Sequence, residues 1–164
     1  MRLVKFILIS VVVFFLLLLG IGLLMPSKVV VSRAINLPIP AGRVVPYLQD
    51  VRKWPLWMQG LDSNQIASTN DSIYQIANLK VQWINRTADN MISQWQSKNG
   101  SIQISSMRVI ADSANGGCTV QWQFEQPLGW LPWERLGSML NEKIMGPQLE
   151  TNLQQLRNQV LANP

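Results

Sequence analysis

Close to the N-terminus lies an apolar run unlike anything in the rest of the chain. Residues 6–25 contain no charged side chain and a single hydroxyl group, that of Ser10. As a helix, this run would extend about 30 Å, which matches the hydrocarbon core of a bilayer. A lone segment in that core must satisfy its backbone polar groups internally, and only a helix does so. The pattern predicts a transmembrane helix that ends at Pro26, with the bilayer as the partner of residues 6–25.

A cleavable signal peptide is the alternative interpretation of this run. Signal peptides have apolar cores of about 7 to 15 residues, followed by a cleavage site of small residues in a small-x-small pattern. Here the run is longer, and its exit, Gly-Leu-Leu-Met-Pro-Ser over 22–27, lacks that pattern. An uncleaved signal anchor over residues 1–26 is therefore the favoured interpretation, with a domain over 27–164.

The charges beside the run predict its orientation. Arg2 and Lys5 precede it and favour a cytoplasmic N-terminus, whereas Lys28 and Arg33 on the other flank weaken the bias. The domain would then lie outside the cytoplasm, on the periplasmic side of the inner membrane in a Gram-negative bacterium.

Beyond the anchor, the spacing of apolar residues changes period along the chain. The predicted elements are a strand over 28–37, short helices over 41–48 and 51–59, several strands between about 65 and 126, and a helix over 136–161.

The strand region has one apolar face. Val120, Trp122 and Phe124 alternate with polar residues, and the same alternation pairs Val81 with Trp83 and Met91 with Trp95. Asn99-Gly100 and Asn115-Gly116-Gly117 are turn signals. Short strands joined by tight turns predict an antiparallel meander with one face buried.

The last predicted helix carries an apolar stripe at spacings of three and four. Pro147 lies inside this helix and is expected to kink or split it, because its ring clashes with the preceding turn. The stripe consists of Leu136, Met139/Leu140, Lys143/Ile144, Pro147, Leu149/Glu150, Leu153, Leu156 and Val160.

Three stretches of sequence resemble the polyketide cyclase/dehydrase-like branch of the SRPBCC (START-like) superfamily. They are the opening from Val31 to Asp50 with Trp54-Pro-Leu-Trp57, the strand Gly117-Cys-Thr-Val-Gln-Trp122, and the final helix with Gly146 and Leu149-Glu150. Cys118 stands where the family pattern has Thr, and Pro40-Ala41-Gly42 departs from the family's Ala-Pro order.

This resemblance covers about residues 28–160 and implies an α+β helix-grip fold. In that fold a curved antiparallel sheet wraps a long C-terminal helix and leaves a cavity between them. The superfamily contains enzymes, lipid carriers, receptors and co-chaperones, so the resemblance alone does not assign an activity.

Composition excludes several kinds of site. There is no histidine, and one cysteine, Cys118, cannot form an internal disulfide or a thiolate zinc site, so no metal or other cofactor is expected. Outside the anchor flank, 12 basic and nine acidic side chains remain, with no block of like charge, which argues against nucleic acid as a partner. The acidic residues fall on turns and polar faces, where none is an evident general base. Cys118 is expected to be a buried, inert side chain.

Seven tryptophans are many for one small domain. They could fill the core between sheet and helix, or some could line an apolar cavity. Arg108 is a further candidate, because its strand phase could point inward with Ile102, Ile104 and Ile110; a solvated Arg108 in a slipped register is the alternative. The cavity candidates are Trp54, Trp57, Trp83, Trp95, Arg108, Trp122 and Phe124.

Two more tryptophans, Trp130 and Trp133, precede the last helix. They are expected to cap a cavity mouth or to lie at the bilayer interface, where aromatic belts are found.

The favoured function is a membrane-anchored, non-catalytic module that binds a hydrophobic small molecule. Two alternatives stay open: a membrane-proximal interaction or scaffold domain with an unidentified protein partner, and an enzyme of the cyclase/dehydratase type that uses one polar residue such as Tyr74 or Arg108.

Overall fold

The computed structural model describes the backbone of residues 2–24, 26–129 and 131–162. Within these ranges, the side chains of residues 2, 3, 23, 132–134 and 136–141 are not described. The prediction for Trp130, and that for the side chain of Trp133, therefore lie outside the described residues.

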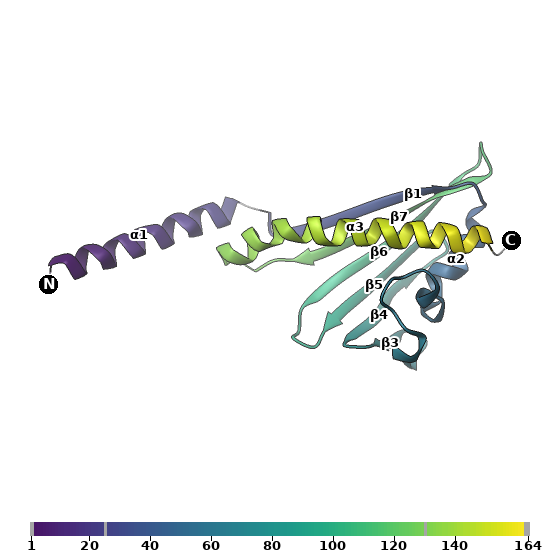
Figure 1. The fold of residues 1–164 in the computed structure, drawn as a ribbon, viewed down its shortest axis with the longest axis horizontal. Helices are drawn as coiled ribbons and strands as arrows, with labels where there is room; N and C mark the ends of the chain where they lie inside the picture. Colours follow the sequence, from purple (N-terminus) through teal and green to yellow (C-terminus); the bar gives the residue numbers. More distant parts are fainter. Residues whose placement is uncertain (1, 25, 130, 163–164) are drawn as a thin grey trace.

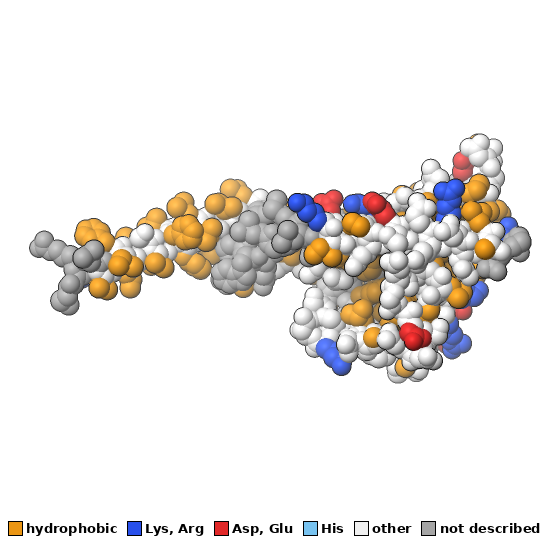
Figure 2. Space-filling view, viewed as in Figure 1, with side chains coloured by type: hydrophobic (Ala, Val, Ile, Leu, Met, Phe, Trp, Pro, Cys, Tyr) orange, Lys and Arg blue, Asp and Glu red, His pale blue; other side chains and the backbone are white. Residues whose placement is uncertain are grey.

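Helix α1 (Arg2–Leu24) projects from the rest of the molecule, as Figure 1 shows. It is the one helix of the described chain that is long and apolar enough to cross a membrane, over Val4–Gly22, and none of that window is buried by the protein. Its exposed apolar side chains are visible along its length in Figure 2. By this test alone, α1 fits a membrane anchor and a signal sequence equally.

Seven strands form one antiparallel sheet in the order β1-β7-β6-β5-β4-β3-β2. Gly100 and Gly116 turn the chain between β5, β6 and β7 with φ angles of 86° and 66°, a region that favours glycine. The strands are β1 (Lys28–Leu37), β2 (Ile66–Asn70), β3 (Ile73–Ile76), β4 (Leu79–Arg86), β5 (Asn90–Ser97), β6 (Ile102–Asp112) and β7 (Gly117–Pro127).

The concave face of the sheet is the apolar face that the alternation predicted. Val81, Trp83, Met91, Val120, Trp122 and Phe124 are all buried there, and Trp95 is half-buried. The predicted phase of β6 is wrong: Ser105, Met107 and Val109 point inward, whereas Ile102, Arg108 and Ile110 are exposed on the other face.

Two short helices cover one end of this face. In helix α2 (Ala41–Gln49), Val44 and Leu48 are buried. The predicted second helix is a 3-10 helix, η1 (Val51–Leu56), whose first turn is capped by the Asp50 side chain accepting from the Arg52 N–H. A further 3-10 turn, η2 (Ser63–Gln65), leads into β2.

Helix α3 (Pro132–Ala162) crosses the concave side of the sheet beside β1 (Figure 1). Its inner face is buried as predicted, at Leu149, Leu153, Leu156 and Val160. Ile144 is 60% exposed, so the predicted stripe is wrong by one position there, and Met145 with Gly146 faces inward instead. Pro147 does not split the helix, which is continuous through it.

An ion pair joins α3 to the sheet. Arg33 of β1 lies on the inner face, and its Nε donates to Glu150 Oε1 at 2.7 Å. Gly146 lies directly against the guanidinium, since a Cβ there would come within 2.5 Å of Arg33 Nη2. The whole arrangement is the α+β helix-grip fold that the resemblance implied.

Candidate functional site

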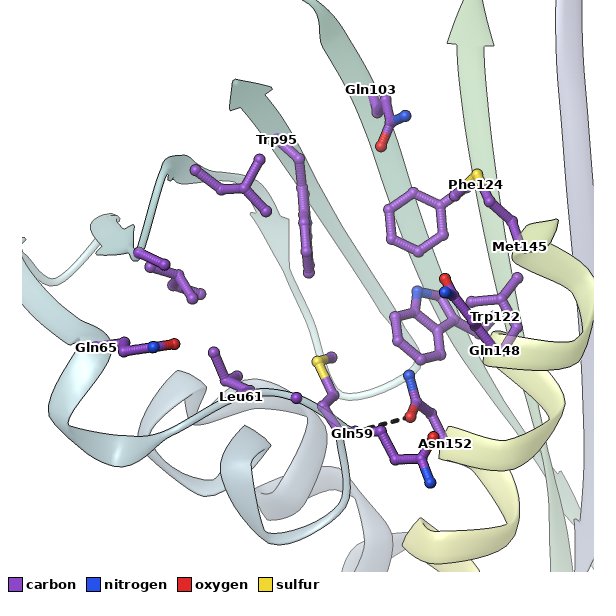
Figure 3. Close-up of a pocket in the computed structure, with 16 residues that line it drawn as sticks. Gln59, Leu61, Gln65, Trp95, Gln103, Trp122, Phe124, Met145, Gln148 and Asn152 are labelled. Atoms are coloured by element: carbon purple, nitrogen blue, oxygen red, sulfur yellow. Dashed lines mark hydrogen bonds between the residues drawn. The ribbon is translucent and has the colours of Figure 1, made fainter. Parts of the chain in front are cut away.

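A cavity of about 310 Å³ lies between the sheet, α3 and the segment after η1. Figure 3 shows its walls. The sheet supplies Ile76, Leu79, Trp95, Trp122 and Phe124; α3 supplies Met145 and Leu149; the segment after η1 supplies Met58 and Leu61. Most of the lining is therefore apolar, as in pockets that bind small hydrophobic molecules.

The cavity occupies the end of the sheet nearest α1. β1 leaves α1 at Lys28, which pairs with Pro127 at the end of β7. Ile76 pairs with Leu79, and Trp95 with Gln103, at the same end of the neighbouring strands. At the far end, α2 and η1 fill the corresponding space. The cavity thus lies at the end of the sheet nearest α1, the helix that projects from the domain in Figure 1.

Six aromatic rings run in one continuous chain behind and around the cavity. Trp54 stacks on Trp95 with ring centroids 5.6 Å apart and meets the edge of Trp83 at 5.8 Å. Trp95 continues to Phe124 at 5.3 Å, Phe124 to Trp122 at 5.4 Å, and Trp122 to Trp57 at 5.4 Å. Edge-to-face and stacked contacts of this kind fix the ring orientations.

Most indole N–H groups of this chain are satisfied inside the protein. Trp54 and Trp57 donate to the backbone oxygens of Leu48 and Tyr47, at 3.0 and 3.1 Å. Trp95 donates to Ser93 Oγ, at 2.9 Å.

Trp122 makes the same kind of hydrogen bond as Trp95: its indole N–H donates to Ser105 Oγ at 2.9 Å. Ser93 and Ser105 are paired residues of β5 and β6, and both are buried. Their small side chains leave room for the rings. Trp83 differs, since its buried Nε1 has no partner among the described residues. Both tryptophans that line the cavity therefore present apolar ring surface to it.

Polar groups at the cavity are all carboxamides. Gln103 Nε2 donates to Gln126 Oε1 at 3.2 Å, and Asn152 Oδ1 accepts from the Gln59 backbone N–H at 2.9 Å, which links α3 to the segment after η1. Gln65 and Gln148 complete the set (Figure 3). None of the described lining residues is charged.

The structure brings together three of the seven predicted cavity residues. Trp95, Trp122 and Phe124 line the cavity. The other tryptophans among them, Trp54, Trp57 and Trp83, are buried core residues. Trp54 and Trp57 contact the lining through Trp95 and Trp122, and Trp83 contacts Trp54.

The prediction of Arg108 as a cavity residue is wrong. It is exposed on the outer face of the sheet, in a polar groove with Ser106, Gln121 and Glu125. An inward guanidinium would need a buried counter-ion, whereas the outer face leaves it hydrated.

The carboxamides were not anticipated from the sequence. Gln103 shares the inward phase of Ser105 and Met107, so a correct register for β6 would have found it. Gln59 and Gln65 lie on irregular segments, where periodicity carries no signal.

Titratable groups with shifted pKa values lie away from the cavity. Burial raises the pKa of the Cys118 thiol. The hydrogen bond from Thr87 lowers the pKa of Asp89, and that from Asn115 lowers the pKa of Asp112. In the described residues, no cluster of three or more His, Cys, Asp or Glu side chains is arranged to hold a metal ion.

Residues 28–160 match the model of one family, described as polyketide cyclase / dehydrase and lipid transport. The chain belongs to this family. No curated protein matches the chain. Solved structures do match the chain, but at low sequence identity. They therefore support the helix-grip fold alone.

Three of these structures cover most of the chain. A START superfamily protein from Mycobacterium smegmatis is 13% identical, with a TM-score of 0.61, and the match covers 82% of this chain and 99% of that one. A protein from Thermobifida fusca is 12% identical, with a TM-score of 0.63 and coverage of 80% and 92%. The protein XoxI from Bacillus cereus is 10% identical, with a TM-score of 0.63 and coverage of 80% and 95%.

Proposed function

We propose that this protein is a membrane-anchored, non-catalytic module that holds a hydrophobic small molecule in the cavity beneath α3. The observation that carries the proposal is the cavity itself: about 310 Å³, walled by Trp95, Trp122, Phe124 and Met145, at the position where the fold can accommodate a ligand. Membership of a family described by lipid transport supports an apolar ligand.

The anchor part of the proposal rests on α1. Its exposed apolar surface needs a nonpolar surrounding, and a bilayer provides one along the full length of the helix. We assign residues 1–26 to an uncleaved anchor and 27–164 to the binding domain, with the N-terminus in the cytoplasm. Because the cavity lies at the end of the sheet nearest α1, it would then be close to the membrane from which a lipid-like ligand comes.

The non-catalytic part is supported by the lining. Acid–base chemistry requires a group that gains or loses a proton within reach of the substrate. Carboxamides, alkyl groups and aromatic rings do not titrate in the working range, and these make up the described walls.

The test uses the full chain, purified in a mild detergent, with native mass spectrometry and organic extraction of what accompanies it. We expect a stoichiometric apolar adduct. Met145→Trp should fill the cavity and remove the adduct. The matched control is Ile144→Trp, the adjacent residue of α3, whose side chain faces solvent. If wild type and both variants carry the same adduct, or none, the cavity is not the binding site.

A further inference from the structure

The polar groups at the cavity have a chemistry that restricts the ligand. Gln59, Gln65, Gln103, Gln148 and Asn152 each carry a neutral carboxamide, which has both donors and an acceptor. Gln65 and Gln148 make no side-chain hydrogen bond within the described protein, and Gln103 keeps its Oε1 acceptor open while its Nε2 is engaged. The site therefore offers hydrogen bonds without offering charge.

Arg33, a cation on the concave face, is already paired with a carboxylate. Arg33 of β1 is the cross-strand partner of Trp122 of β7. Its guanidinium forms an ion pair with Glu150 at 2.7 Å and packs against Gly146. A carboxylate or phosphate in the cavity would lose hydration and meet no opposite charge among the described lining residues. Such a loss is costly for an ion and small for an uncharged polar group.

The cavity is also small. At about 310 Å³ it lies at the lower end of the roughly 300–1,000 Å³ typical of small-molecule pockets. Its apolar walls come from both sides: Met145 of α3 lies beside Phe124, and Trp95 lies across the space from them (Figure 3). A single apolar chain or ring system fits this space better than a two-chain lipid.

From these observations we propose that the ligand is an uncharged amphiphile, with one apolar chain held between Trp95, Phe124 and α3 and a neutral hydroxyl, ester or carbonyl end hydrogen-bonded by the carboxamides. This inference rests on the proposed binding function and adds the charge and size of the ligand. It predicts selection by head group at constant chain.

The experiment compares three oleoyl compounds with one chain and different ends, using the detergent-solubilised full protein. Radiolabelled mono-oleoylglycerol is displaced by unlabelled mono-oleoylglycerol, by oleate at pH 8 and by oleoyl lysophosphatidate. We expect mono-oleoylglycerol to displace the label at a concentration at least about tenfold below either anion, because only the anions lose charge solvation. Met145→Trp should abolish specific uptake of the label.

A positive charge introduced at Gln103, in the cavity lining, provides the second part of the experiment. Gln103→Arg should reverse the ranking toward oleate. Gln96→Arg is the control. It adds the same charge on the neighbouring strand β5, at the same end of the sheet as Gln103 but on the outer face.

The outcomes separate the two claims. Anions that compete as well as the neutral compound in the wild type, together with loss of uptake in Met145→Trp, would overturn the neutral-ligand inference and leave binding intact. Equal reversal by Gln103→Arg and Gln96→Arg would also overturn it, because the effect would then be a surface charge effect. No saturable uptake of labelled mono-oleoylglycerol would overturn this inference, and if the native mass spectrum also shows no apolar adduct, the proposed function fails with it.

Discussion

The two ends of the concave face differ in how they are filled. At the end far from α1, which we call the packed end, Val44 and Leu48 of α2 and Val51 of η1 are fully buried against the sheet. At the end near α1, the open end, the wall residues Trp95 and Met145 are half-buried and a cavity remains. The same sheet thus contains a rigid core and a binding space side by side.

This difference has a local cause. Trp54 lies between the two ends, because it stacks on Trp95 of the open end and meets Trp83 of the packed end. The chain of rings holds the cavity wall from behind, so the wall keeps its shape without being filled. Preorganised walls of this kind reduce the free energy that ordering the site would cost on binding.

The largest expected effect is at the boundary between the two ends. Trp54→Ala should lower the free energy of unfolding by about 3–5 kcal/mol, because it leaves a cavity where a fully buried ring was and removes the bond to Leu48 O. Leu61→Ala, in the half-buried wall of the open end, should cost clearly less. Thermal unfolding of the full chain in detergent, followed by near-ultraviolet circular dichroism, measures both. Equal losses would show that the open end is as tightly packed as the other.

Two buried serines allow a finer comparison. Ser105→Ala leaves the Trp122 N–H without its acceptor in a fully enclosed place and should cost about 1–3 kcal/mol. Ser93→Ala removes the same kind of bond from Trp95. Both rings line the cavity, but Trp95 is half-buried whereas Trp122 is 2% exposed, so water can replace the Ser93 hydroxyl more readily and the cost should be smaller. Chemical denaturation of both variants tests the order. A larger loss for Ser93→Ala would contradict the assignment of an open end.

The contact between α3 and β1 predicts a smaller, conditional effect. Gly146→Ala gains up to about 1 kcal/mol of helix propensity but brings a Cβ against the Arg33 guanidinium. We expect little or negative change in stability in the wild type and a gain when Arg33→Met removes the obstruction. A double-mutant cycle measures the coupling. Independent, additive effects would mean that Arg33 moves aside freely.

The buried faces of the sheet and of α3 were largely predictable from the sequence, and the cavity between them was not. The alternation that buries Val120, Trp122 and Phe124, and the stripe of Leu149, Leu153 and Leu156, follow directly from the periods of strand and helix. The α+β helix-grip fold, which the family resemblance implied, is confirmed.

Errors arose where the pattern was ambiguous. β6 carries three isoleucines on its outer face and Gln103 and Ser105 on its inner face, so the hydrophobic pattern favoured the wrong phase and included Arg108 among the cavity candidates. The solvated Arg108, the alternative, is the one observed. Burial of Ser93 and Ser105 depends on tryptophans from other parts of the sheet, which local periodicity does not contain. Which tryptophans border a cavity and which fill the core depends on where α2 and η1 stop, and that is a property of the assembled fold.

The mildest way to compare the two ends is through a thiol. Cys118 is buried at the packed end, and burial raises its pKa above the ordinary value of 9.0. As the pH rises, the Cys118 thiol ionises in the unfolded chain before it ionises in the folded one. The stability that the protonated thiol contributes is therefore complete below about pH 9 and falls as the pH rises through the folded-state pKa.

We therefore expect Cys118 to react slowly with a water-soluble disulfide reagent at pH 8, because both burial and the protonated state oppose attack. A Leu61→Cys thiol in a Cys118→Ala background, placed in the half-buried wall of the open end, should react many times faster. Added mono-oleoylglycerol should slow the second reaction and leave the first unchanged, since the proposed binding cavity, with its apolar walls, lies at the open end. Equal rates for the two thiols would mean that the packed end opens as readily as the cavity, and the distinction between core and binding space would fail.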